Sequence, residues 1–123
     1  MSRKMNILVI DDDETIRELL AMVLELEGYD FSLAGDGEEG LEKIKNNKID
    51  CVILDLLMPI MEGLLFLKVI RKQLNIDVPV IVLSAFYRPG IEDEARNAGA
   101  TEFIFKPVEA RELIKQIIRF TGA

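Results

Sequence analysis

Residues 51–55 read CVILD, four apolar residues followed by an aspartate, and this stretch decides how the rest of the chain is interpreted. Three further apolar runs also end at polar residues: ILVI at 7–10, VIVL at 80–83 and FIF at 103–105. Runs this short and this rich in β-branched or aromatic residues are typical of strands buried on both faces, as in a parallel sheet covered by helices. The sequence therefore predicts a buried parallel sheet.

The segments between these runs have helical periodicity. In the segment 14–27, apolar residues recur at spacings of three and four, which predicts an amphipathic helix. Further helices are predicted at 38–45, about 61–74, 91–98 and about 109–120, and a weaker strand at 29–34. Strands that alternate with helices imply right-handed crossovers and a doubly wound α/β sheet. Two halves wound in opposite directions from the middle would make the first and third strands neighbours.

Five polar residues follow the four apolar runs: Asp11 and Asp12, Asp55, Ser84 and Lys106. In a parallel sheet they all reach the edge formed by the carboxyl ends of the strands, where ligands of open α/β sheets bind. Carboxylates in one pocket repel each other unless a divalent cation neutralises them. A lysine and a hydroxyl are suited to the oxygens of a phosphoryl group. Together these residues predict a site for a metal ion and a phosphate.

Each of these residues also has a plainer interpretation. Acidic residues after a strand are often helix N-caps, and Asp13, with Glu14 in the first turn, is well placed for that role. A serine after a strand is usually part of a turn, and a single lysine is usually a solvated surface charge. The occurrence of all five at strand ends, in this order, favours the site.

Composition excludes several classes of protein. The chain has 123 residues, which fits one domain spanning 1–123, and a net charge of -7, which argues against binding of nucleic acid. It contains no histidine, so imidazole bases and imidazole metal ligands are excluded, and a metal bound by oxygen points to Mg²⁺ or Mn²⁺.

The lone Cys51 is expected in the core. No membrane span or signal peptide is predicted, and a cytoplasmic protein is expected.

The segments ILVIDDD (7–13), VILDLLMP (52–59), VLSA (82–85) and FKP (105–107) resemble those of response-regulator receiver domains. These are the phospho-accepting, CheY-like modules of two-component signalling. The resemblance covers essentially the whole chain, in order and with the spacing of the family. It implies a flavodoxin-like fold with five helices and the strand order 2-1-3-4-5. It also implies that the Lys106–Pro107 bond is cis, which is inexpensive only before proline.

The resemblance assigns a role to each acidic residue. Asp55 would be the phosphoacceptor, attacking a phosphohistidine on a partner protein. Asp11 and Asp12 would hold Mg²⁺ together with Asp55, one of them through water, and the backbone carbonyl of Leu57 would complete the protein ligands.

The same resemblance implies a switch. Ser84 would bind the phosphoryl group and shift toward it, and Lys106 would pair with that group, or with Asp55 before phosphorylation. Phe103 stands where the family keeps an aromatic switch residue, and its ring would fill the space that Ser84 vacates. The change would reach the face formed by the fourth helix, the fifth strand and the fifth helix. The alternative for Phe103 is a plain core residue.

The expected partner is a sensor histidine kinase or a histidine phosphotransfer protein, and a homodimer through the face just described is a further expectation. Neither nucleic acid nor membrane is expected to bind this domain, and its only chemistry would be its own phosphorylation and dephosphorylation.

One alternative function is an interaction module that never gains phosphate. Another is a Mg²⁺-dependent phosphatase with an aspartyl nucleophile. That chemistry typically uses a second acid two residues after the nucleophile, where this chain has Leu57.

Besides Ser84, which stands where the family more often has Thr, two departures from the family pattern are specific to this chain. Leu57 and Phe86 are apolar at positions that flank the path of a hydrolytic water, which suggests slow loss of the phosphoryl group. Leu65 and Val69, four residues apart, share one helix face that often carries charge in the family. They are either partly buried under a neighbouring helix or form a docking or self-association patch.

Overall fold

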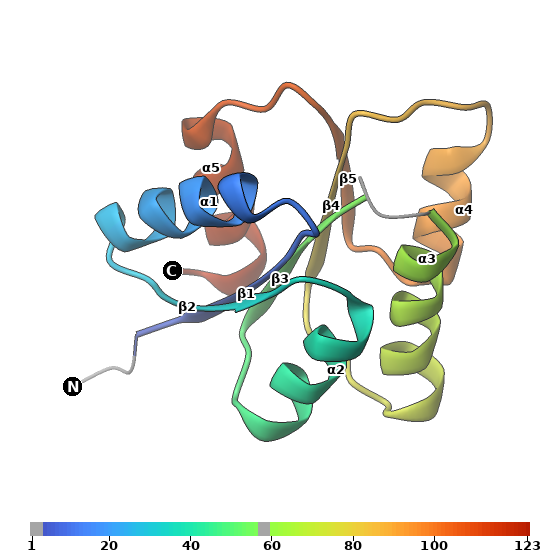
Figure 1. Ribbon diagram of the computed structural model, residues 1–123, viewed down its shortest axis with the longest axis horizontal. Coiled ribbons are helices and arrows are strands. Elements are labelled where there is room, and N and C mark those ends of the chain that lie inside the picture. Colours follow the sequence, from blue (N-terminus) through green and yellow to red (C-terminus); the bar gives the residue numbers. More distant parts are fainter. Residues whose placement is uncertain (1–3, 57–59) are drawn as a thin grey trace.

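The core of the molecule is a parallel sheet in the order β2-β1-β3-β4-β5 (Figure 1). The computed structural model describes residues 4–56 and 60–123. In chain order the elements are β1 (Asn6–Ile10), α1 (Glu14–Leu26), β2 (Asp30–Ala34), α2 (Gly37–Asn46), β3 (Cys51–Asp55), α3 (Ile60–Lys68), the π-helical segment η1 (Val69–Gln73), β4 (Val80–Ser84), α4 (Ile91–Ala98), β5 (Glu102–Phe105) and α5 (Ala110–Thr121). The predicted doubly wound fold and its strand order are confirmed.

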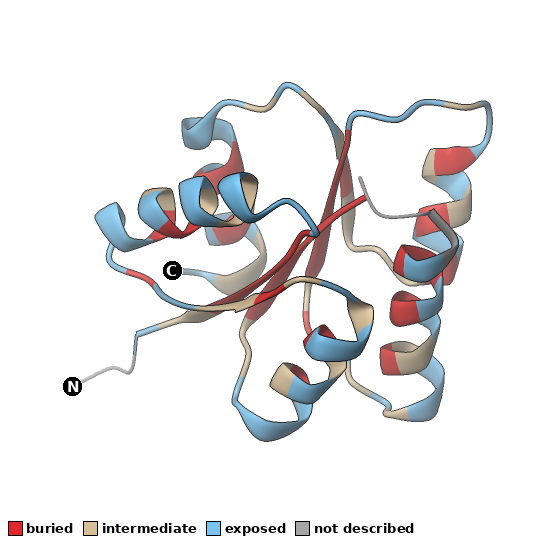
Figure 2. Cartoon of the chain, in the orientation of Figure 1, coloured by how far each residue is buried: buried red, intermediate tan, exposed pale blue. Residues whose placement is uncertain are grey.

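Helices cover both faces of the sheet, α1 and α5 on one face and α2, α3 and α4 on the other (Figure 1). Successive residues of β1 alternate between two cores, as the twofold period of a strand requires. Leu8 and Ile10 belong to the core under α2, α3 and α4, and Ile7 and Val9 to the core under α1 and α5. The three central strands, β1, β3 and β4, are accordingly the most deeply buried part of the described chain (Figure 2).

The strand register brings the predicted site together. β1 pairs with β3 so that Ile10 lies opposite Leu54, and the next residues along the chain are Asp11, just after β1, and Asp55, the last residue of β3. The ladder also continues past β5, where the backbone N–H of Lys106 donates to the carbonyl of Ser84 over 2.8 Å. Residues from β1, β3, β4 and β5 therefore meet at one edge.

The expectation that the run 103–105 is buried on both faces is wrong. β5 lies at the edge of the sheet and has a strand neighbour on one side only. Phe103 is buried, whereas the ring of Phe105 is 39% exposed. The three central runs, in β1, β3 and β4, are buried as predicted.

The helix predicted at about 61–74 changes its hydrogen bonding partway along. After α3 the chain continues as η1, in which the N–H of Leu74 donates to the carbonyl of Val69. The guanidinium of Arg71 donates to the carbonyls of Ile76, Val78 and Gly99, over 2.9, 2.7 and 3.0 Å, and so fastens the end of η1 to the turn before β5.

None of the helices in residues 4–56 and 60–123 is both long and apolar enough to cross a bilayer.

Candidate functional site

Asp11 begins the loop between β1 and α1 and is fully buried. One carboxylate oxygen, Oδ1, accepts a hydrogen bond from the backbone N–H of Asp13 at 2.9 Å. Asp13 in turn caps α1, as predicted, by accepting from the N–H groups of Thr15 and Ile16 at 2.9 and 3.3 Å. The local turn therefore fixes the orientation of the Asp11 carboxylate.

The other oxygen of Asp11, Oδ2, is buried and accepts no hydrogen bond within the described residues. Burial is the main reason why the pKa of Asp11 rises from 3.8 to about 7. The neighbouring Asp55 raises this pKa further, whereas the N–H of Asp13 and the charge of Lys106 lower it. A buried carboxylate oxygen without a donor, next to a second carboxylate, is an environment that a divalent cation would stabilise.

Asp55 is the last residue of β3 and is also fully buried. Its Oδ2 atom forms an ion pair with the ammonium of Lys106, whose side chain is 19% exposed. This contact is the pairing that the resemblance implied for the state without phosphate. The Lys106–Pro107 peptide is cis, also as implied.

The residues assigned to a metal are only partly brought together. Asp11 and Asp55 are buried side by side, but the side chain of Asp12 is exposed, and Leu57 lies outside the described residues. Across residues 4–56 and 60–123, no three acidic side chains form a cluster that could hold a metal ion. Two carboxylates still fit Mg²⁺, which uses one or two of them and takes its other ligands from water and phosphate oxygens. The Mg²⁺ site stays a prediction.

Ser84, the last residue of β4, is buried, and its hydroxyl is held by its own loop. The hydroxyl donates to the carbonyl of Phe86 and accepts from the N–H of Phe86, both at 3.0 Å. The predicted contact with a phosphoryl group would require the hydroxyl to give up its bond to the Phe86 carbonyl.

Phe103 belongs to the core under α2, α3 and α4. Its ring meets that of Phe105 edge-on, with centroids 4.9 Å apart. Phe105 also contacts Tyr87, with a centroid distance of 5.8 Å. A row of three aromatic rings therefore runs from the core to the loop after Ser84.

Sequence reasoning missed Arg17. This residue lies on α1, and its Nη1 atom donates to the backbone carbonyl of Asp11 over 2.6 Å. A basic residue near the N-terminus of a helix interacts unfavourably with the helix dipole. The position of Arg17 in the sequence was therefore an indication that its side chain makes a specific contact. Arg17 fixes the backbone from which Asp11 and Asp12 extend.

The residues that are specific to this chain are placed as follows. Phe86 is 46% exposed, and its partner in the slow-hydrolysis hypothesis, Leu57, is outside the described residues. Val69 is half-buried. Leu65 is 60% exposed, so the interpretation that it is partly buried under a neighbouring helix is wrong. The docking or self-association patch stays a prediction.

Comparison with known proteins agrees with this geometry. Residues 7–118 match the family model of the response regulator receiver domain. Response regulator RR06 of Streptococcus pneumoniae is 42% identical over 113 residues, covering 92% of this chain and 51% of that protein. Response regulator MprA of Mycobacterium sp. is 38% identical, covering 90% of this chain and 48% of that protein. The chain thus spans about half the length of these curated relatives.

A solved structure, the receiver domain of the Francisella response regulator 1452, superimposes with a TM-score of 0.88 at 34% identity. The match covers 97% of this chain and 98% of that one. Response regulators act with sensor kinases in two-component systems. By family match, sequence identity and fold, this chain belongs to the response regulator receiver domains.

Proposed function

We propose that this chain is a phospho-accepting switch, in which Asp55 takes a phosphoryl group from a phosphohistidine of a sensor histidine kinase or histidine phosphotransfer protein. The observation that carries the proposal is the ion pair between Asp55 and Lys106, with the buried Asp11 beside it. A lysine that already contacts the acceptor carboxylate can pair with the negative charge of the phosphoryl oxygens after transfer. It is also partly exposed, and so can meet an incoming phosphoryl group.

In the proposed transfer, an oxygen of Asp55 attacks phosphorus, and the bond from phosphorus to the histidine nitrogen of the partner breaks. The electron pair of that bond returns to the imidazole, which takes up a proton from solvent. Asp55 is left as an acyl phosphate, and Lys106 pairs with one of its oxygens. Asp11 and Asp55, together with Asp12 and the carbonyl of Leu57, would hold Mg²⁺, or Mn²⁺ as the other ion of this type. When bound, the metal offsets the repulsion between the carboxylates and the phosphoryl oxygens.

The switch that we infer begins at Ser84. Its hydroxyl would exchange the carbonyl of Phe86 for a phosphoryl oxygen, drawing the loop after β4 toward the site. The ring of Phe103 is already buried, so its part in the switch would be a repacking against Phe105 rather than an entry from solvent. These rings link the site to the face formed by α4, β5 and α5.

That face also supports the proposed homodimer. Phe105 and Ile118 are exposed on it, at 39% and 46%. Glu102 of β5 already pairs with Arg96 of α4 at 2.6 Å and with Arg119 of α5 at 3.6 Å. A change in β5 would therefore be passed to both helices. We place the protein in the cytoplasm, where sensor kinases present their phosphohistidine.

Intact mass measurement after incubation with Mg²⁺ and acetyl phosphate tests this function. We expect a single phosphoryl adduct that is absent from Asp55→Ala. Sustained release of phosphate from acetyl phosphate over many rapid turnovers, abolished in Asp55→Ala, would instead indicate the phosphatase. A wild-type chain that gains no adduct would indicate the interaction module that never carries phosphate.

A further inference from the structure

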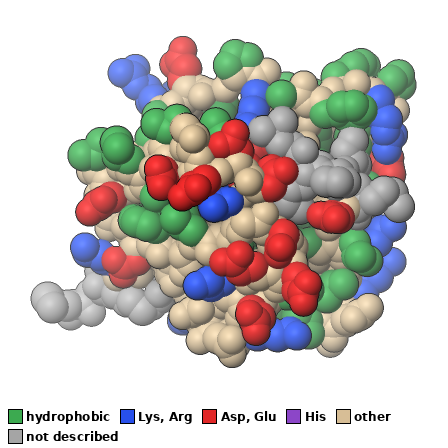
Figure 3. All heavy atoms as spheres, in the orientation of Figure 1, with side chains coloured by type: hydrophobic (Ala, Val, Ile, Leu, Met, Phe, Trp, Pro, Cys, Tyr) green, Lys and Arg blue, Asp and Glu red, His purple; other side chains and the backbone are tan. Residues whose placement is uncertain are grey.

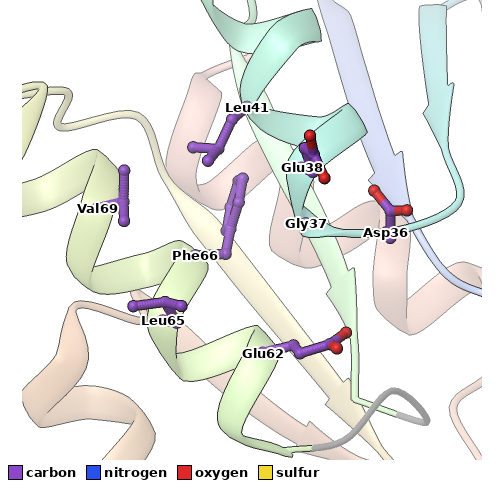
Figure 4. A pocket seen from close by; sticks show the side chains of 8 residues that line it. All are labelled: Asp36, Gly37, Glu38, Leu41, Glu62, Leu65, Phe66 and Val69. Carbon is purple, nitrogen blue, oxygen red and sulfur yellow. The ribbon is translucent and has the colours of Figure 1, made fainter.

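A hollow of about 300 Å³ lies between α2 and α3, on the sheet face opposite to α1 and α5 (Figure 4). Its apolar wall is formed by Leu41 of α2, by Leu65 and Phe66 of α3, and by Val69 of η1. Gly37 of α2 also lines it and contributes no side chain, which widens the opening. None of these residues takes part in the phosphorylation site.

Leu65 is the unusual member of this wall. The adjacent residues of α3, Leu64, Phe66 and Leu67, are all buried, whereas Leu65 is 60% exposed. A second hollow, of about 270 Å³, opens on its other side between α3 and α4. Leu65 therefore lies between two hollows, and a partner could contact its side chain from both sides.

The rim of the hollow is acidic. Asp36, Glu38 and Glu62 line it, and its lining residues include neither a lysine nor an arginine, whereas Lys68 lines the second hollow. Acidic side chains gather over α2 in the space-filling view (Figure 3). Asp36 is held in place because its carboxylate caps α2 through the N–H of Glu39 at 2.8 Å. The groove thus combines an apolar wall with negative charge at the rim.

The acidic rim argues against a helix of a second copy of this chain as the segment that binds in the groove. The exposed apolar stripe of α1, formed by Leu19, Met22 and Leu26, is accompanied by Glu18 and Glu25, so α1 of a second copy would be repelled by the rim.

The outer side of α5 is basic, with Arg111, Lys115 and Arg119. Within the described chain, however, Ile118 is the only exposed large apolar residue of that helix. A groove with several apolar wall residues needs a segment with at least two apolar anchors.

We propose that the groove between α2 and α3 binds an amphipathic helix of a partner protein, whose apolar stripe packs against Leu41, Leu65 and Val69. Lysine or arginine residues beside that stripe lie over Asp36, Glu38 and Glu62. This is the helix-in-groove mode of recognition, in which apolar anchors at helical spacing supply affinity and flanking charges supply selectivity. The proposal does not rest on phosphorylation of Asp55, so Asp55→Ala retains the interaction.

The test uses a fluorescent model peptide, a helix with leucines spaced three and four apart and lysines beside them. We expect saturable binding to the wild type that weakens with added salt, because the rim charges are exposed. Leu65→Glu is expected to weaken binding by about tenfold or more, since it removes an apolar contact that the bound helix would bury. Its matched control is Leu19→Glu, an exposed leucine of α1 on the opposite face, which is expected to bind normally.

Two further variants separate shape from charge. Gly37→Leu adds a side chain where a Cβ would meet Phe66 and Glu62 only at ordinary contact distances of 3.6 and 3.8 Å, and it is expected to block the groove with every charge intact. Glu38→Lys is expected to weaken binding, whereas Glu42→Lys, on the same helix but outside the lining, should have a smaller effect.

Three outcomes overturn the proposal. Undiminished binding to Leu65→Glu would mean that the peptide is attracted only by the net negative charge, which that variant increases. Equal binding of a peptide with glutamate in place of lysine would remove the role of the rim. Sedimentation in which the wild type self-associates and Leu65→Glu does not would make a second copy of this chain the occupant.

Discussion

Lys106 reaches across strand β4 to pair with Asp55, so that the loop after β5 is tied to the end of β3. Asp55 is fully buried, and this ion pair provides a positive charge for a carboxylate that would otherwise lie in the core beside Asp11. The same contact holds the lysine ready for a phosphoryl group. Stability and proposed chemistry therefore depend on one pair of side chains.

Replacing Lys106 by methionine leaves the buried Asp55 carboxylate without its cation. We expect the free energy of unfolding to fall by about 3 kcal/mol, the low end for removing one partner of a buried pair, because the Lys106 side chain is partly exposed. Asp55→Asn in the same background should recover much of that loss. Urea denaturation of the two single variants and the double variant measures the coupling. Additive effects would mean that the pair contributes nothing to stability.

Magnesium affinity should depend on pH through Asp11. Its pKa of about 7 in the metal-free protein means that a bound ion must displace a proton at lower pH. We expect the affinity for Mg²⁺ to fall by about tenfold for each pH unit below 7 and to level off above it. Titration calorimetry on either side of neutral pH checks this, with Asp12→Asn as a control that retains the pH dependence. A flat profile in the wild type would contradict the raised pKa.

Asp11 should also destabilise the metal-free fold at neutral pH. The unfolded chain releases this proton near pH 3.8, the folded chain near pH 7. The contribution of Asp11 to stability is therefore complete below 3.8 and is lost as the pH rises through 7. Compared with Asp11→Asn, the wild type should lose free energy of unfolding across this window, and Mg²⁺ should restore it. Parallel curves for both proteins without metal would refute the assignment.

Ser84 should couple phosphorylation to the rest of the molecule. Ser84→Ala removes the hydroxyl that now bonds to Phe86, and we expect it to gain phosphate slowly and to lose the response of Phe103 and Phe105. Ser84→Thr keeps the hydroxyl and restricts its rotamers, so the response should persist. Proton–carbon spectra of the aromatic rings, with and without acetyl phosphate, report this. A full response in Ser84→Ala would show that the coupling bypasses the hydroxyl.

The lifetime of the acyl phosphate should reflect the apolar side chains at positions 57 and 86. We expect Phe86→Glu and Leu57→Asn each to shorten it several-fold, because a polar group admits and orients water. Loss of the adduct over time, followed by intact mass, gives the rate. Phe86→Leu is the matched apolar control. Unchanged decay in both polar variants would remove water exclusion as the cause of a long lifetime.

Much of the fold could be predicted because three of the strands are buried on both faces. In β1, β3 and β4 the uninterrupted apolar runs leave no other stable placement. The burial of β5 was predicted wrongly because its apolar run resembles those of the central strands, although its position at the sheet edge exposes Phe105. The change from α3 to η1 was also hidden, because a shift in hydrogen bonding leaves the apolar spacing nearly intact.

The sequence could predict which residues form the site but not which hydrogen bonds they make. Strand ends and parallel register bring Asp11, Asp55 and Lys106 together whatever the side chains do. The bond between Ser84 and Phe86 was not foreseen, because it arises from the need of a buried hydroxyl for partners within its own loop. The exposure of Leu65 was equally open, since periodicity does not reveal how far apart two neighbouring helices lie.

The most direct test of the account is to locate the phosphoryl group. After reaction with acetyl phosphate and Mg²⁺, borohydride converts a phosphoaspartate to homoserine, and peptide mass spectrometry identifies the altered residue. Homoserine is expected at position 55 alone, dependent on Mg²⁺ and strongly reduced in Lys106→Met. Homoserine at Asp11 or Asp12, or an unaltered chain under conditions in which the protein is folded and binds Mg²⁺, would contradict it.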